Sequence, residues 1–104
     1  MIVQEYALQD SLLQVQEEIS RALADFERAR DQALLFKTGI IPQATQTVTS
    51  MLAGYQVDKV DFRNLVSAQI TLFNHETLYW KAFSEAHLAV ATLVAAVGTE
   101  NVYE

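Results

Sequence analysis

The stretch Gly54-Tyr55-Gln56-Val57-Asp58-Lys59-Val60-Asp61 separates two long runs of helical sequence and decides how the chain folds. The apolar periodicity that precedes it lapses here and resumes at Phe62. Asp58 or Asp61 can cap a new helix, because either carboxylate can accept a hydrogen bond from an early backbone N–H. We therefore predict a solvent-exposed turn at about 57–61, between a helix over about 3–56 and a second helix over about 62–97.

A heptad pattern precedes the turn, with apolar residues at spacings that alternate between four and three. Its members are Leu8, Leu12, Val15, Ile19, Ala22, Phe26, Ala29, Ala33, Phe36 and Ile40. Pro42 interrupts this pattern, because proline lacks a backbone donor and clashes with the preceding turn. Apolar residues nevertheless continue at Ile41, Val48, Leu52 and Tyr55, and no Gly or Pro follows until Gly54. These features predict that Pro42 kinks the first helix without ending it.

Two apolar stripes follow the turn, where 62–97 contains no Gly or Pro. The first stripe comprises Phe62, Leu65, Leu72, Tyr79, Phe83, Val90, Leu93 and Val97, and the second comprises Val66, Ile70, Phe73 and Trp80. Together they form an arc wider than a two-stranded coiled coil requires, which indicates contacts on both sides of this helix. Gly98 is predicted to end the helix, because glycine is frequent just past a helix C-terminus.

The composition agrees with an all-α fold in a single domain over residues 1–104. Only 3 Gly and 1 Pro occur in 104 residues, which argues against a sandwich or barrel with many turns. The predicted fold is a long antiparallel, coiled-coil-like helical hairpin, with the first helix kinked at Pro42. The alternative is a three-helix bundle over 3–37, 42–56 and 62–97, in which Pro42 begins a helix where its missing N–H costs nothing.

Composition also excludes several classes of partner and location. The chain has no Cys, so disulfides and thiolate chemistry are absent, and its net charge of −6 disfavours binding to nucleic acid or anionic lipid. The start of the chain lacks the basic region of a secretory signal peptide. The longest uncharged apolar run, 88–97, has about half the length of a membrane span. We therefore expect a soluble chain with no signal peptide and no bilayer span.

No motif for catalysis, metal binding or cofactor binding is complete. The segment at 75–79 begins with His75-Glu76 but has Tyr79 where a zinc-protease signature requires a second His. Glu85 and His87 have the wrong spacing for a di-metal site in a helical bundle. There is also no phosphate-binding glycine loop and no nucleophile on a strained turn. We expect no enzyme activity, no metal and no cofactor.

The turn and its surroundings resemble the C-terminal helical hairpin of outer-membrane efflux proteins, the TolC-like exit ducts. The resemblance lies in 53–62, in Leu65, Ser67-Ala68-Gln69, Leu72 and Glu76, and in 93–98. The segment Ile40-Ile41-Pro42-Gln43-Ala44 is similar to one in the heavy-metal-efflux branch, which includes CusC and CzcC. The match covers about 30–98 and rests on a diffuse pattern.

This resemblance implies a piece of the periplasmic α-barrel of a trimeric outer-membrane duct. Such a duct passively exports metal ions or small toxic solutes, together with a periplasmic adaptor and an inner-membrane pump. The parent protein would lie in the outer membrane and periplasm. The alternative function is an independent soluble helical interaction module.

The same resemblance assigns roles to the tip of the hairpin. Tyr55 matches the gating tyrosine, and the tip loop that meets the adaptor matches Gln56, Val57, Asp58, Lys59 and Val60. Two positions depart from the family pattern, because Asp58 replaces the usual glycine and Val60 replaces a basic residue, with Lys59 beside it. Considered without the resemblance, Tyr55 closes the last turn of a helix.

An antiparallel hairpin centred near Asp58 places Phe62 beside Tyr55 and Gly98 near Ile19. Residues before Ile19 then lack a partner in their own chain. They include the apolar residues Leu8, Leu12, Leu13 and Val15. Because burial of such residues stabilises association, we expect a homo-oligomer, either a dimer or a trimer, with these residues at the interface.

Overall fold

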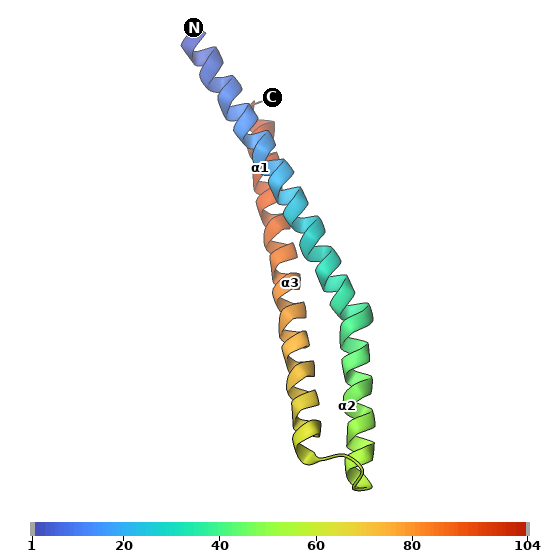
Figure 1. The fold of residues 1–104 in the computed structure, drawn as a ribbon. Helices are drawn as coiled ribbons and strands as arrows, with labels where there is room; N and C mark the ends of the chain where they lie inside the picture. The colour runs from blue at the N-terminus through green and yellow to red at the C-terminus, as the bar shows by residue number, and fades with distance from the viewer. Residues whose placement is uncertain (1, 104) are drawn as a thin grey trace. The chain divides into compact units, whose positions relative to one another are not determined.

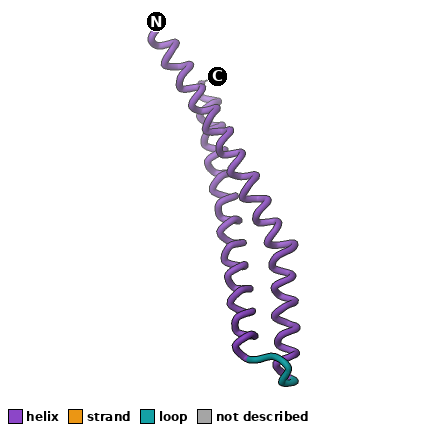
Figure 2. Tube along the Cα trace, viewed as in Figure 1, coloured by secondary structure: helices purple, strands orange, loops and turns teal. Residues whose placement is uncertain are grey.

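The computed structural model describes residues 2–103, and it describes the surroundings of side chains 4–99. Its elements are α1 (Ile2–Leu35), the π-helix η1 (Phe36–Ile40), α2 (Ile41–Gln56) and α3 (Phe62–Tyr103) (Figure 1). Residues 57–61 form the turn, shown in teal in Figure 2, and no strand occurs among residues 2–103. The all-α prediction is confirmed, and the turn lies at the predicted residues.

The helix continues through Pro42, and no loop separates α1 from α2. Leu35 and Ile41, which flank the π-helix, both have right-handed helical backbone. The Ile41 N–H donates to the carbonyl of Phe36, five residues earlier. Pro42 has no N–H for the carbonyl of Thr38, and its ring crowds that carbonyl. The wider π-turn accommodates this disruption, so the backbone stays helical where a separate third helix would need a loop.

The prediction that Gly98 ends the last helix is wrong. α3 passes through Gly98 and ends at Tyr103. Gly98 does not adopt the positive φ of a glycine cap, and a Cβ placed on it would contact nothing within 4 Å. Glycine inside a helix costs about 1 kcal/mol relative to alanine, and the helix nevertheless continues through this residue.

The chain divides into two compact units. Unit 1 comprises Met1–Ala29 with Ser84–Glu104, and unit 2 comprises Arg30–Phe83. The described core of unit 1 consists almost entirely of alanine, with Val15, Ala22, Ala29, Ala86, Ala89 and Ala96 buried. Val15, Ala22 and Ala29 follow one another at intervals of seven, as the heptad pattern predicts. Their small side chains permit close approach of the two helical segments.

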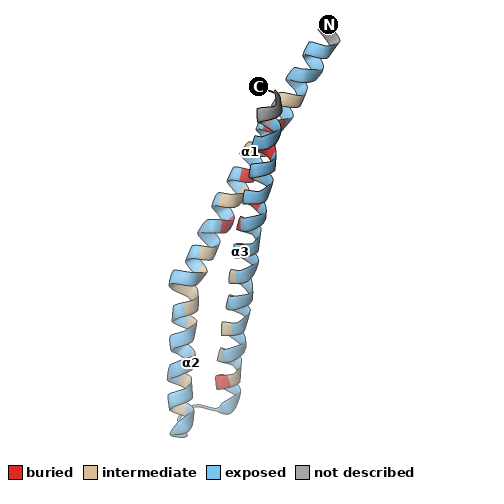
Figure 3. Ribbon diagram, turned by 180° about the vertical axis from the view of Figure 1, so that it is seen from behind, coloured by how far each residue is buried: buried red, intermediate tan, exposed pale blue. Residues whose placement is uncertain are grey.

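Unit 2 has a sparser core than unit 1. Its buried residues among those described are Leu65 and Ala82, both on α3. α2 contributes no buried residue, as Figure 3 shows by the lack of red along it. Many large apolar side chains therefore remain at the surface of this unit.

One helix segment, Phe62–Thr99, is long and apolar enough to cross a membrane by length and composition. Only 22% of its most apolar 18-residue window is buried. This finding does not support the expectation of no bilayer span, which rested on the uncharged run at 88–97 alone.

Candidate interaction surfaces

The turn is closed by a Schellman motif at the C-terminus of α2. The Lys59 N–H donates to the Gly54 carbonyl at 2.8 Å, and the Asp58 N–H donates to the Tyr55 carbonyl at 3.1 Å. Asp58 occupies the left-handed position of the motif, with φ 63°. Glycine usually holds this position because it lacks a Cβ. Asp58 thus occupies the position of this turn where the backbone favours glycine most.

Gly54 allows Val60 to pack against the last turn of α2. A Cβ built on Gly54 would lie 2.5 Å from Cγ2 of Val60 and 3.3 Å from its Cβ. Real side chains do not approach this closely, so a larger residue at 54 would displace Val60. The path of the turn therefore depends on the absence of a side chain at this position.

Asp61 caps the N-terminus of α3, as one of the two predicted possibilities. Its carbonyl accepts hydrogen bonds from the backbone N–H groups of Asn64 at 3.1 Å and Leu65 at 3.2 Å. Its carboxylate accepts a longer bond, 3.4 Å, from the backbone N–H of Arg63. The Asp58 carboxylate does not take part in this cap.

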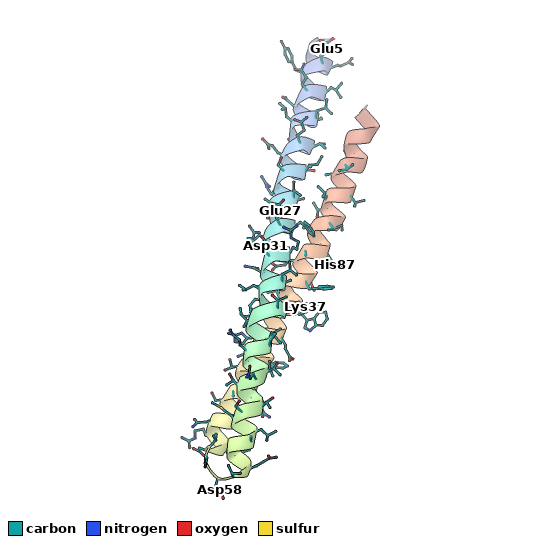
Figure 4. The ribbon with its side chains drawn as sticks, turned by 90° about the vertical axis from the view of Figure 1, so that its right-hand side faces the viewer. Glu5, Glu27, Asp31, Lys37, Asp58 and His87 are labelled. Carbon is teal, nitrogen blue, oxygen red and sulfur yellow. The ribbon has the colours of Figure 1, made fainter. Side chains whose placement is uncertain are left out.

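The predicted tip residues lie together at one end of unit 2, where Figure 4 labels Asp58. Tyr55, Gln56, Val57, Asp58 and Lys59 are exposed, and Val60 is half-buried. The ring of Tyr55 packs against that of Phe62, with centroids 5.7 Å apart, as the hairpin register predicts. Tyr55 is thus both accessible to a partner and a structural contact across the turn.

The four residues of the predicted oligomer interface differ in exposure. Leu8 and Leu13 are exposed and Leu12 is half-buried. Val15 is buried within unit 1, with 6% of its surface exposed, so it is not available for a contact with another chain. Its predicted place at an outer interface followed from a last helix that ends at Gly98, whereas α3 continues to Tyr103.

An uncharged cleft of about 460 Å³ lies between α2 and the first part of α3 in unit 2. Its walls carry hydroxyl and amide groups from Gln43, Thr47, Asn64, Ser67 and Thr71. The hydroxyls of Thr47 and Thr71 donate to backbone carbonyls four residues earlier, each at 3.0 Å. Their hydrogens are therefore used within their own helices, and their oxygens can only accept.

His75 also lines this cleft. Its ring lies 6.1 Å from that of Phe36, in the π-helix, and is tilted by 40°. Its Nδ1 atom is buried and has no hydrogen-bond partner. Among the described residues, no group of three or more metal-ligating side chains gathers here or elsewhere. The histidine of the incomplete zinc-protease signature thus packs against an aromatic ring.

Unit 1 carries a smaller cleft of about 340 Å³ with charged walls. Acidic and basic residues share it, including Glu18, Arg21 and Glu85. Arg28 and Asp25, which also line it, form an ion pair at 2.9 Å. Such exposed pairs contribute about 0–1 kcal/mol, so this cleft is a solvated surface with little stabilising effect.

The second apolar stripe predicted on the last helix is exposed. Ile70, Phe73 and Trp80 are 55%, 67% and 59% exposed. Trp80 also contacts Tyr79 and Phe83 edge to face, with centroids 5.1 Å and 5.4 Å away. Exposed aromatic clusters of this kind are enriched at protein interfaces.

Comparisons of the chain with protein-family models, with curated proteins and with solved structures gave no match.

Proposed function

We propose that this chain is a non-enzymatic helical hairpin that acts by assembling with other helices, as part of the periplasmic α-barrel of an outer-membrane efflux duct. In this proposal the helical run 2–56 bends at Pro42 and runs antiparallel to α3. The observation that carries the proposal is a tightly closed turn between long helices whose outer faces remain apolar and exposed. This combination suits a wall element that is flanked by neighbours.

The sparse core supports assembly as the mode of action. Six of the eight buried apolar residues are alanines, and Val15 and Leu65 are the larger ones. Nineteen large apolar side chains are exposed among the described residues. Soluble monomers rarely expose contiguous apolar patches of more than a few hundred Å². A chain with this distribution gains stability from neighbouring helices.

The composition of α2 supports a surface that faces water inside a duct. No charged residue occurs between Lys37 and Asp58, and the exposed positions of α2 carry mainly Thr, Ser and Gln. Hydroxyl and amide groups keep such a wall hydrated without holding ions by charge. Metal ions or small toxic solutes would then pass without a strong binding site, and the inner-membrane pump would supply the energy.

The tip would provide the docking site for a periplasmic adaptor. Val57 is 62% exposed and lies beside Asp58 and Lys59, which are also exposed. An exposed apolar side chain that is followed by two residues of opposite charge offers both a hydrophobic contact and orientation. Tyr55 would take the gating position, with a closing network different from the family pattern because Val60 is not basic.

Export by the full-length protein tests this proposal. Val57→Asp should impair export and leave assembly of the trimer intact, because the new charge opposes burial of the tip against the adaptor. Val57→Thr is the matched control, since it keeps the shape of the side chain without adding a charge. Unchanged export after simultaneous changes at Val57, Asp58 and Lys59 would refute the role of the tip.

The alternative is an independent helical interaction module. The alanine core of unit 1 favours this alternative, because the chain forms that core from its own residues without a second chain. The genomic reading frame distinguishes the two functions. An in-frame upstream region with a signal peptide and alternating strands supports the duct. A translation start at Met1 supports the module.

A further inference from the structure

The exposed stripe on α3 forms a regular heptad pattern within unit 2. We call Val66, Ile70, Phe73, Thr77 and Trp80 the outer stripe. The spacings alternate between four and three, and every member except the half-buried Val66 is exposed. The buried residues of α3 in unit 2, Leu65 and Ala82, lie outside this stripe. The outer stripe therefore has the geometry of a coiled-coil surface without a partner in its own unit.

Polar residues flank the outer stripe in a complementary arrangement. Gln69 and Glu76 precede stripe residues Ile70 and Thr77, whereas Asn74 and Lys81 follow Phe73 and Trp80. All four are exposed. Glu76 and Lys81 are the only charged residues of α3 between Arg63 and Glu85, and neither forms an ion pair within the described part of the chain.

The spacing of these flanking residues specifies one orientation for a second copy. In a parallel two-stranded coiled coil, a residue that directly precedes the stripe, such as Gln69 or Glu76, lies opposite the residue five positions later in the partner chain. Glu76 would thus face Lys81 of a second copy, and Lys81 would face the second copy's Glu76. Gln69 and Asn74 stand in the same relation and can form amide hydrogen bonds.

The opposite orientation lacks this complementarity. An antiparallel register that aligns Ile70 with Trp80 of a second copy also aligns Thr77 with Phe73. The two Glu76 carboxylates then face each other across the axis and repel. The charge pattern therefore discriminates between the two orientations.

We propose that the outer stripe binds a second copy of this chain in parallel and in register, forming a dimer with a two-fold axis along α3. Trp80 and Phe73 are its apolar anchors, and the two Glu76–Lys81 pairs set its orientation. The surface differs from the N-terminal residues Leu8, Leu12 and Leu13. The pairing is argued from the residues of the outer stripe and its flanks, so it does not depend on the proposed function.

Tryptophan fluorescence measures this association directly, because Trp80 is the only tryptophan of the chain. Emission should shift to shorter wavelength as the protein concentration rises, in parallel with dimer formation in sedimentation. Phe73→Asp should weaken the dimer more than about 100-fold. Leu52→Asp, an acidic substitution at an exposed leucine of α2 in the same unit, should leave it unchanged. A monomer at tens of micromolar with a constant emission maximum would overturn the proposal.

Charge reversal and cross-linking test the orientation. Glu76→Lys and Lys81→Glu should each weaken self-association about tenfold, and an equimolar mixture of the two variants should restore it. Because the chain has no cysteine, Thr77→Cys should oxidise to a disulfide-linked dimer through its own counterpart. A disulfide that forms instead between Thr77→Cys and Phe73→Cys chains would show antiparallel pairing and refute the proposal. Association only with lipid vesicles would also refute it.

Discussion

Replacing Asp58 with glycine should stabilise the turn that joins α2 and α3. Asp58 has φ 63°, where its Cβ crowds the backbone. An L-residue pays about 1–2 kcal/mol in this conformation, and aspartate lies at the lower end because its short polar side chain tolerates it. Glycine removes this strain, but it has more conformational freedom in the unfolded chain. We expect a net gain of about 0.5–1 kcal/mol in the free energy of unfolding.

Electrostatics adds to this effect at low ionic strength. The C-terminus of α2 carries partial negative charge, and Asp58 places a carboxylate beside it. Asp58→Asn removes that charge and retains a side chain that tolerates the left-handed region. Its stability should lie between those of the native chain and Asp58→Gly. Asp58→Val should be destabilising, because a β-branched side chain is strongly disfavoured at positive φ.

Urea denaturation followed by circular dichroism at one fixed protein concentration measures these differences. The concentration must be held constant, since association with a second chain also shifts the midpoint. A gain of this size corresponds to a rise of roughly 2–8 °C in Tm for a domain of this length. If Asp58→Gly is no more stable than the native protein, or if Asp58→Val is equally stable, the left-handed backbone at Asp58 is not a source of strain.

Three further substitutions probe the packing. Leu65→Ala should lower the free energy of unfolding by about 2–5 kcal/mol in thermal or urea unfolding, because Leu65 is 4% exposed. Leu52→Ala, at a 43% exposed position, should lower it by less than about 1 kcal/mol. Equal effects of the two changes would contradict the assigned core. Gly54→Ala should destabilise the folded chain by up to about 2 kcal/mol, because the new methyl group clashes with Val60. The same change in a Val60→Ala background should be neutral or stabilising. Equal effects in both backgrounds would exclude the clash. Pro42→Ala should raise the helical content measured by circular dichroism and stabilise the chain by up to about 3 kcal/mol; marked destabilisation would mean that Pro42 serves as the start of a separate helix.

Local features of the turn could be predicted from the sequence. The bounds at 57–61 follow from the lapse of apolar periodicity and from Asp61, whose cap involves residues only two to four positions away. The disturbance at Pro42 was equally visible, because proline always removes one donor. The sequence did not predict the form of this disturbance, which is a π-helix over 36–40. A kink, a break and a wider turn each accommodate the missing donor.

The candidate surfaces depended more on contacts between distant residues. The second stripe of α3 could be recognised from its spacing, and its exposure depended on how the helices pack. The end of the last helix was wrongly predicted at Gly98, because glycine permits a left-handed helix cap but does not impose one. The same error placed Val15 at an outer interface, although it is buried within unit 1.

The sequence by itself determined the helical class, the position of the turn and the repeating apolar faces, because these depend on backbone sterics and on hydrogen bonds between near neighbours. Only the tertiary structure decided which face became the core. In unit 1, alanines at intervals of seven are buried, whereas in unit 2 the larger Phe73 and Trp80 remain exposed. Burial is a property of pairs of segments far apart in the chain, and small side chains allow the closest approach between helices even though larger ones are more hydrophobic.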